Sequence, residues 1–210
     1  MEILRHMAKY QIYGVGAALV DTEVVVSDEF LKLNAIEKGV MTLVDESRQA
    51  ELLNALSAEK HHLMKQSGGS ACNTVTAAAS FGSKTFFSGK VASDDDGEHF
   101  INDLSDSGVS FHTASPEAGV TGKCLVMVTD DAERTMNTYL GASEQLTRRE
   151  IDEAALLQSE WLYIEGYLLT DDTRAALIKD VVAKAKSAGV KVALSLSDPF
   201  VAQIFADNQS

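Results

Sequence analysis

The sequence predicts an α/β protein in which helices flank a layered parallel sheet, with a small antiparallel β sheet beside it. Two patterns in its 210 residues indicate this fold class. Short apolar strand segments alternate with helical segments, an order typical of right-handed crossovers and parallel sheets. In the middle of the chain, two strand segments are separated only by a turn, which indicates a hairpin and antiparallel pairing.

The first strand is expected at residues 10–15, and a tight glycine turn follows it. The chain then re-enters an extended conformation at about residues 20–26. Gly14 and Gly16 resemble the start of a dinucleotide fingerprint, but Leu19 stands in place of the third glycine. A strand follows the turn, so no helix N-terminus is available to hold a pyrophosphate. We therefore interpret the glycines as parts of a structural turn.

The next segments are simple to assign. A strand is expected at residues 41–45 and a helix at 46–56, where apolar side chains recur on one face. A run of small residues over 71–79 predicts a closely packed helix. Strands are expected at 84–88 and 109–112, on either side of a further helix.

An acidic run opens that further helix. Asp94, Asp95 and Asp96 are consecutive, and their spacing does not match a calcium-binding loop. Carboxylates in the first turn of a helix are stabilised by its dipole. We therefore interpret these three residues as a helix start and predict no metal site there.

The last part of the chain returns to alternation. After the hairpin over residues 124–140, a strand is expected at 161–164 and a helix at 171–189. Residues 190–196 then alternate between apolar and other side chains and predict a further strand. This strand, helix and strand form a crossover unit of a parallel sheet.

Charge and composition exclude several function classes. The chain has 18 Lys and Arg against 31 Asp and Glu, a net charge of −13, which argues against a nucleic-acid partner or an anionic membrane surface. Cys72 and Cys124 are too few for a disulfide framework and lack metal-site spacing. We find no apolar run long enough to span a membrane and no signal-peptide pattern, so we expect a cytoplasmic protein.

Four residues are candidates for ligand binding on their own chemistry. Asp21 lies just past the glycine turn, where its carboxylate could accept paired hydrogen bonds from a diol or cap the turn. Gly68 and Gly69 precede the small-residue helix and would allow a ligand to approach its first amides, unless they form only a flexible loop. Asn73 follows one turn into that helix, where it could bind a hydroxyl or be merely solvated.

Several segments in order along the chain carry a family pattern. They are GVGAALVD, GGSACNTVTAAASFG, FFSGKVASDDDGEHF, TGKCLVMVTDDAERTM, YLGASEQL, YIEGYLLT and LSLSDPF. The first three resemble the first signature region of the PfkB (ribokinase-like) carbohydrate kinases. The last four are most similar to the adenosine-kinase-like branch of that family. The resemblance extends over residues 9–205.

The resemblance implies a substrate site. Asp21 and Asn73 would hydrogen-bond the hydroxyls of a sugar, and Gly68 and Gly69 would offer main-chain contacts to it. Glu165, in YIEGY, matches an acidic position at the substrate end of the sheet. Ser70 stands where ribokinase has a lysine, which favours the nucleoside branch.

The resemblance also implies a Rossmann-type layered domain with a lid. Strands over about 20–27, 41–44 and 121–140 would form a small antiparallel β lid that closes over the substrate. In related sugar kinases this lid makes a dimer contact, so a homodimer through the lid is expected. The partner would otherwise be a small-molecule sugar or nucleoside.

The implied reaction is transfer of the γ-phosphoryl group of ATP, with magnesium, to a primary hydroxyl of a ribosyl-type substrate. Adenosine-like nucleosides and ribose- or fructose-type sugars are both open alternatives. The second family signature, a GAGD-like motif with the catalytic base, is not found, and Asp198 in SDPF does not replace it.

We therefore expect residues 1–210 to be the N-terminal portion of a single ribokinase-like domain that is incomplete at its C-terminus. The ATP and magnesium sites would lie mainly beyond residue 210, and no catalytic residue is expected within the chain. On this expectation the chain alone is inactive. A non-catalytic binding module that keeps the substrate half of the fold is the alternative.

Overall fold

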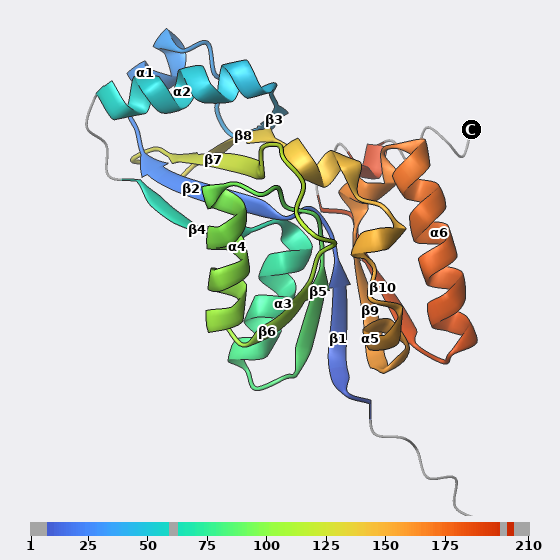
Figure 1. The fold of residues 1–210 in the computed structure, drawn as a ribbon. Helices are drawn as coiled ribbons and strands as arrows, with labels where there is room; N and C mark the ends of the chain where they lie inside the picture. Colours follow the sequence, from blue (N-terminus) through green and yellow to red (C-terminus); the bar gives the residue numbers. More distant parts are fainter. Residues whose placement is uncertain (1–7, 59–62, 198–200, 204–210) are drawn as a thin grey trace, which may run out of the picture.

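A computed structural model describes residues 8–58, 63–197 and 201–203, which form two five-stranded sheets (Figure 1). Asp198 lies outside the described residues. No helix in the described part of the chain is long and apolar enough to cross a membrane.

The first sheet is entirely parallel, as the alternation of strands and helices predicts. Its order is β10-β9-β1-β5-β6, and each neighbouring pair runs in the same direction. The strands are β1 (Tyr10–Val15), β5 (Thr85–Ser88), β6 (Val109–His112), β9 (Ser159–Glu165) and β10 (Lys191–Ser195). The expected strand positions in this sheet agree with the structure to within two residues.

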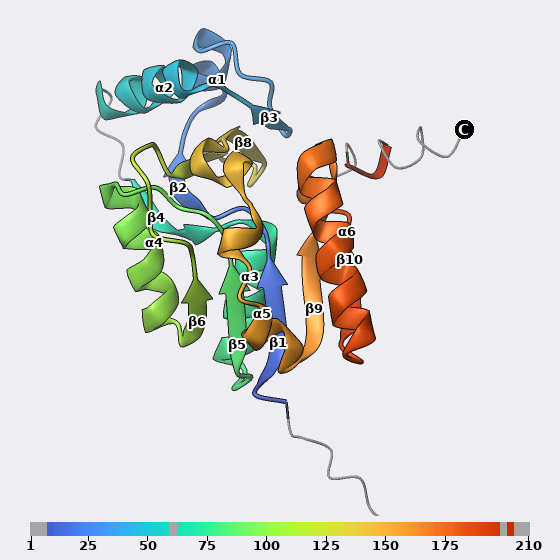
Figure 2. The same ribbon diagram turned by 45° about the vertical axis from the view of Figure 1, so that its right-hand side comes forward.

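Helices cover both faces of this parallel sheet (Figure 2). One face packs against α3 (Ser70–Ser80) and α4 (Asp95–Asp106), and the other against α5 (Glu153–Leu157) and α6 (Asp172–Ser187). The first core includes Phe87 and Phe100, and the second includes Tyr13 and Leu162; all four side chains are fully buried. The sheet is therefore a central layer buried between helices.

The second sheet lies beyond the carboxyl ends of the parallel strands (Figure 1). Its order is β3-β8-β7-β2-β4. The strands are β2 (Leu19–Val25), β3 (Met41–Leu43), β4 (Met64–Gly68), β7 (Gly122–Val128) and β8 (Arg134–Tyr139). The three predicted lid segments, 20–27, 41–44 and 121–140, all contribute strands to it.

This sheet is mixed, and the prediction of an antiparallel sheet is wrong in that respect. β2 pairs with β7 and β3 pairs with β8 in parallel, whereas β7–β8 and β2–β4 are antiparallel. The reason lies in the connections. β2 follows β1 and β7 follows β6, so both strands leave the parallel sheet in the same direction.

Two α-helices and one strand were not predicted from the sequence. β4 is an edge strand with three exposed residues in a row, so it lacks the apolar alternation typical of a strand. The short helix α5 was also missed. The third, α1 (Asp28–Leu33), has a local signal, because the Ser27 hydroxyl accepts a hydrogen bond from the Phe30 amide and caps the helix.

The two faces of the second sheet are covered differently. Helices α1 and α2 (Glu46–Ala58) cover the face that carries Val24 and Leu125, which we call the outer face. Side chains alternate along a strand, so Asp21 and its register partner Cys124 lie on the opposite, inner face. The inner face is therefore the one that includes the candidate ligand residue.

Candidate functional site

The predicted substrate residues gather where the two sheets meet. Asp21 is on β2, Gly68 ends β4, Gly69 caps α3, and Glu165 ends β9 beside β1. Asn73 lies in the first turn of α3. In α/β proteins, ligands bind beyond the carboxyl ends of parallel strands, and these residues lie at that edge.

Asp21 and Gly68 are in very close contact. A Cβ atom built on Gly68 would lie 2.1 Å from the Asp21 Cγ atom, closer than any real contact. Only a glycine at position 68 therefore allows the Asp21 carboxyl to keep this position. No described residue donates a hydrogen bond to that carboxyl, which is only partly buried and keeps its acceptor capacity.

The electrostatic environment disfavours the ionised form of Asp21. Burial raises the pKa of Asp21 to about 6. The positive charge of Arg134 limits this rise, and the negative charges of Glu165 and Glu23 add to it. A carboxylate held in this way gains when a ligand donates hydrogen bonds to it.

Glu165 connects three segments of the chain. Its side chain is 2% exposed, and its two oxygens accept hydrogen bonds from the Ala17 amide (3.4 Å) and the Ala71 amide (3.1 Å). Burial raises the pKa of Glu165, and hydrogen bonds from the backbone of Ala71, from Ser70 and from the backbone of Ala17 partly offset the rise. The carboxyl thereby joins the end of β9 to the β1–β2 linker and to the N-terminus of α3.

Gly69 has a conformation that other residues rarely adopt. Its φ angle is +99°, and a Cβ atom there would lie 2.4 Å from the Ala17 carbonyl oxygen. The Gly69 carbonyl accepts a hydrogen bond from the Asn73 amide at 2.9 Å. The Asn73 side chain is exposed, so it is open to a ligand as well as to solvent.

The comparison with known protein families identifies the family of this chain. Residues 38–209 match the family described as pfkB family carbohydrate kinase. The chain belongs to the pfkB family. No curated protein sequence matches the chain.

Solved structures of several kinases share the fold. An adenosine kinase from Sinorhizobium meliloti is 36% identical, with a TM-score of 0.85 over 96% of this chain and 61% of its own. A "probable sugar kinase" from Rhizobium etli is 32% identical, with a TM-score of 0.86 over 97% and 61% of the two chains. An adenosine kinase from Anopheles gambiae is 25% identical, with a TM-score of 0.81 over 95% and 60%. The chain spans about three fifths of the length of these relatives.

Sequence reasoning missed two residues of this pfkB-family site. Arg134 lies on the inner face, four positions from Thr138, which pairs with Cys124 opposite Asp21. That position follows from strand alternation once the pairing is known. Ser143 has no local signal, because its hydroxyl bonds the amide and the carbonyl of Ala18, both at 3.0 Å, across 125 residues of sequence.

The two cysteines of the pfkB-family chain are near Asp21 but are not reactive nucleophiles. Burial raises the pKa of the Cys72 thiol and of the Cys124 thiol to about 12. Both thiols therefore remain protonated at neutral pH, and the thiolate is the reactive form.

The acidic run of the pfkB-family chain starts a helix, as predicted. Asp94 is the N-cap of α4, and its carboxylate accepts a hydrogen bond from the Gly97 amide at 2.9 Å. Among the described residues, no group of three or more His, Cys, Asp or Glu side chains is arranged to hold a metal ion.

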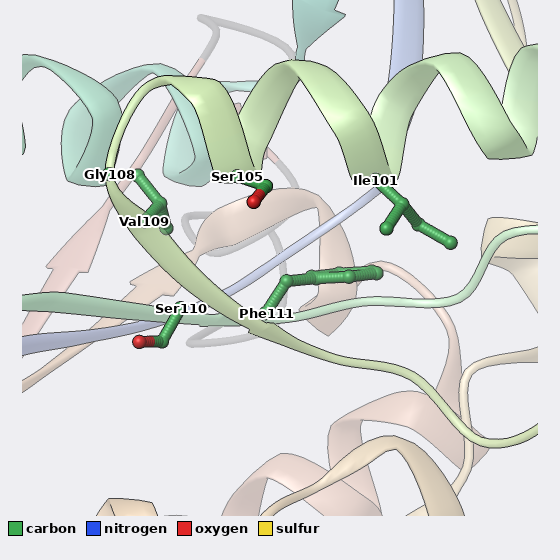
Figure 3. Close-up of a pocket in the computed structure, with 6 residues that line it drawn as sticks. All are labelled: Ile101, Ser105, Gly108, Val109, Ser110 and Phe111. Carbon is green, nitrogen blue, oxygen red and sulfur yellow. The ribbon is translucent and has the colours of Figure 1, made fainter.

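A pocket of about 510 Å³ lies elsewhere, between α4 and the edge strand β6 (Figure 3). It is lined by Ile101, Ser105, Gly108, Val109, Ser110 and Phe111. None of these side chains is titratable. Gly108 and Val109 lie at the amino end of β6, whereas β2, the strand that carries Asp21, lies beyond the carboxyl ends of the parallel strands (Figure 1). The pocket is therefore separate from the candidate site.

Proposed function

We propose that this pfkB-family chain binds the acceptor substrate of an ATP-dependent kinase reaction. In that reaction, a primary hydroxyl of a ribosyl-type substrate receives the γ-phosphoryl group of ATP. The observation that carries the proposal is the Asp21 carboxyl. It lies beyond the carboxyl ends of the parallel sheet, against Gly68, and no described residue donates to it. A carboxylate with free acceptor positions can accept hydrogen bonds from two neighbouring hydroxyls of a sugar.

The other site residues have supporting roles in the proposal. Gly69 and the first turn of α3 offer main-chain groups, and the exposed Asn73 amide can both donate to and accept from a hydroxyl. Glu165 holds the β1–β2 linker against α3 through the Ala17 and Ala71 amides. Glu165 therefore contributes to the substrate site indirectly, because it fixes the backbone that surrounds the bound sugar.

The second sheet acts as the lid in this proposal. It lies over the carboxyl ends of the parallel strands and presents its inner face to the site. Phosphoryl transfer requires that water is kept away and that the acceptor hydroxyl is held in line with the γ-phosphate. Closing the inner face over a bound sugar would meet both requirements.

ATP would supply the phosphoryl group, and magnesium would neutralise its charge. The described residues contain no cluster that fits a metal ion, so we assign neither magnesium nor ATP to any of them. We also assign no catalytic base. What the described residues do is bind the acceptor, orient it and exclude water.

The substrate class has two candidates. Adenosine is favoured by the names of two of the similar structures, which are adenosine kinases, and by Ser70 in the place of the ribokinase lysine. A simple sugar of the ribose or fructose type is favoured by the "probable sugar kinase" at 32% identity.

Calorimetric titration of the protein with adenosine, ribose and fructose tests the proposal. Wild-type protein is expected to bind one of the three. The Asp21→Asn variant is expected to lose roughly 10- to 100-fold in affinity, since hydrogen bonds to a charged group are removed. Glu23→Gln is the matched control, because Glu23 lies on the same face of β2, two residues further along.

Equal affinities for Asp21→Asn and Glu23→Gln would overturn the assignment of Asp21. Binding without phosphoryl transfer from ATP by the full-length protein would favour the alternative, a non-catalytic binding module. Failure of all three compounds to bind would overturn the proposed function itself.

A further inference from the structure

Helix α4 is firmly anchored to the parallel sheet and also reaches the second sheet. Its Phe100 and Leu104 side chains are fully buried in the core with Phe87 and Val109. It also contacts β4 and β2 of the second sheet. The helix thus contacts strands of both sheets.

The central contact is an ion triad. The Asp96 carboxylate contacts the ammonium groups of Lys65 and Lys123, each at 2.7 Å. Lys65 belongs to β4 and Lys123 to β7, the two strands that flank β2. Asp96 is 8% exposed, and it therefore depends on these lysines for compensation of its charge.

Two further carboxylates of this region bond the same strands. Asp103 accepts a hydrogen bond from the Ser67 amide of β4 at 2.6 Å. Asp94 accepts one from the Thr121 amide at 2.9 Å, immediately before β7 begins. Three acidic side chains at or on α4 thus hold the second sheet at β4 and β7.

The register places this attachment directly behind Asp21. Lys123 pairs with Val20 and Lys65 pairs with Thr22, so both lysines lie on the outer face of the second sheet. Asp21 lies between Val20 and Thr22 and points to the inner face. A shift of β4 or β7 relative to α4 would therefore carry Asp21 with it.

We propose that Asp96 is a positioning residue, which through Lys65 and Lys123 sets the orientation of the second sheet and so places Asp21 over the parallel strands. The role of Asp21 as a sugar ligand rests on the proposed function, whereas the attachment of the sheet does not. Lys123 is the more important partner, because its side chain is 27% exposed against 51% for Lys65 and is less screened by water.

The test compares Asp96→Asn with Asp95→Asn. Asp95 is the preceding residue in the same helical turn, is exposed, and loses the same charge on substitution. Amide hydrogen exchange is measured in β4 and β7, with β1 and β5 as an internal reference for folding. Affinity for adenosine, ribose and fructose is measured on the same samples.

Asp96→Asn is expected to speed exchange in β4 and β7 about tenfold while leaving β1 and β5 unchanged. It is expected to weaken binding of the sugar or nucleoside roughly 10- to 100-fold, as misplacement of a ligand group does. Asp96→Glu, which keeps the charge, is expected to restore most of the affinity. Lys123→Met is expected to have a larger effect than Lys65→Met.

Identical exchange in Asp96→Asn and Asp95→Asn would overturn the attachment. Faster exchange with unchanged affinity would overturn the positioning role. If wild-type protein binds none of the three compounds, the proposed function fails, and the exchange comparison still decides whether Asp96 holds the sheet.

Discussion

The Asp21 carboxyl lies in surroundings that favour its protonated form. Both the stability of the protein and its affinity for substrate are therefore expected to depend on the protonation of this one residue. Burial raises its pKa to about 6 from the ordinary value of 3.8. The folded protein therefore binds a proton at Asp21 more tightly than the unfolded chain does. Stability linked to this group is full below pH 3.8 and is lost as the pH rises toward 6.

This linkage predicts the behaviour of Asp21→Asn in chemical denaturation. At pH 7.5 the variant is expected to be more stable than the wild type by roughly 2–3 kcal/mol, because Asn has no charge to bury. Near pH 4 the difference should largely vanish. Asp95→Asn, which removes the charge of an exposed carboxylate, serves as the control, and a pH-independent difference for Asp21→Asn would contradict the raised pKa.

Substrate affinity should show the opposite dependence on pH. A protonated Asp21 loses acceptor capacity, so the affinity of wild-type protein for its sugar is expected to fall as the pH drops below about 6. Titration calorimetry between pH 5 and 8 (about three units, spanning the shifted pKa) measures this. A flat profile would mean that Asp21 does not accept hydrogen bonds from the ligand.

Gly68 provides a steric test at the same residue scale. In Gly68→Ala, the new Cβ atom would be forced against the Asp21 carboxyl, 2.1 Å from its Cγ atom. Overpacking of this kind is expected to cost about 1–3 kcal/mol in unfolding free energy and to weaken sugar binding. Gly119→Ala is the control, since the nearest atom to its Cβ is Ala92 Cβ at 3.7 Å. Equal effects of the two substitutions would contradict the close contact.

At the scale of elements, the helix N-cap residues Asp94 and Asp171 differ in which segments they hydrogen-bond. Asp171 caps only α6, where it accepts from the Arg174 amide at 3.0 Å. Asp94 caps α4 and also accepts from the Thr121 amide, the residue before β7. The Asp94 cap therefore connects two elements, whereas the Asp171 cap stabilises one.

The comparison of Asp94→Ala with Asp171→Ala measures this difference. Loss of a simple cap is expected to cost about 1 kcal/mol, and Asp171→Ala should fall near that value. Asp94→Ala should cost roughly 2–3 kcal/mol, because the buried Thr121 amide also loses its partner. Thermal unfolding of both variants provides the measurement, and a smaller loss for Asp94→Ala would be inconsistent with the double role.

At the scale of the whole molecule, the inner face of the second sheet is only partly covered. Val25, Leu43 and Met64 are 62%, 52% and 56% exposed, and the strand register places all three on the face that carries Asp21. The homodimer through this sheet, which the family resemblance implies, stays a prediction. An apolar sheet face of this kind is compatible with such a contact.

Light scattering on Val25→Lys tests that dimer. The wild type is expected to be dimeric, and a lysine on the inner face should shift it toward monomer because a charge would be buried in the contact. Leu33→Lys is the control, since Leu33 is 75% exposed on α1, which covers the outer face. A monomeric wild type would contradict the prediction.

The sequence alone determined the parallel sheet, the separate second sheet and the identity of the candidate residues. Apolar alternation, helix starts such as Asp94 and glycine placement are local properties, and they can be read without knowing what lies nearby. Only the tertiary structure decided the strand directions in the second sheet and the place of β4. It also decided that Asp96 meets Lys65 and Lys123, and that Glu165 bonds the Ala17 amide across 148 residues. These contacts join distant segments whose meeting depends on how the chain leaves one sheet and enters the next, which local periodicity does not contain.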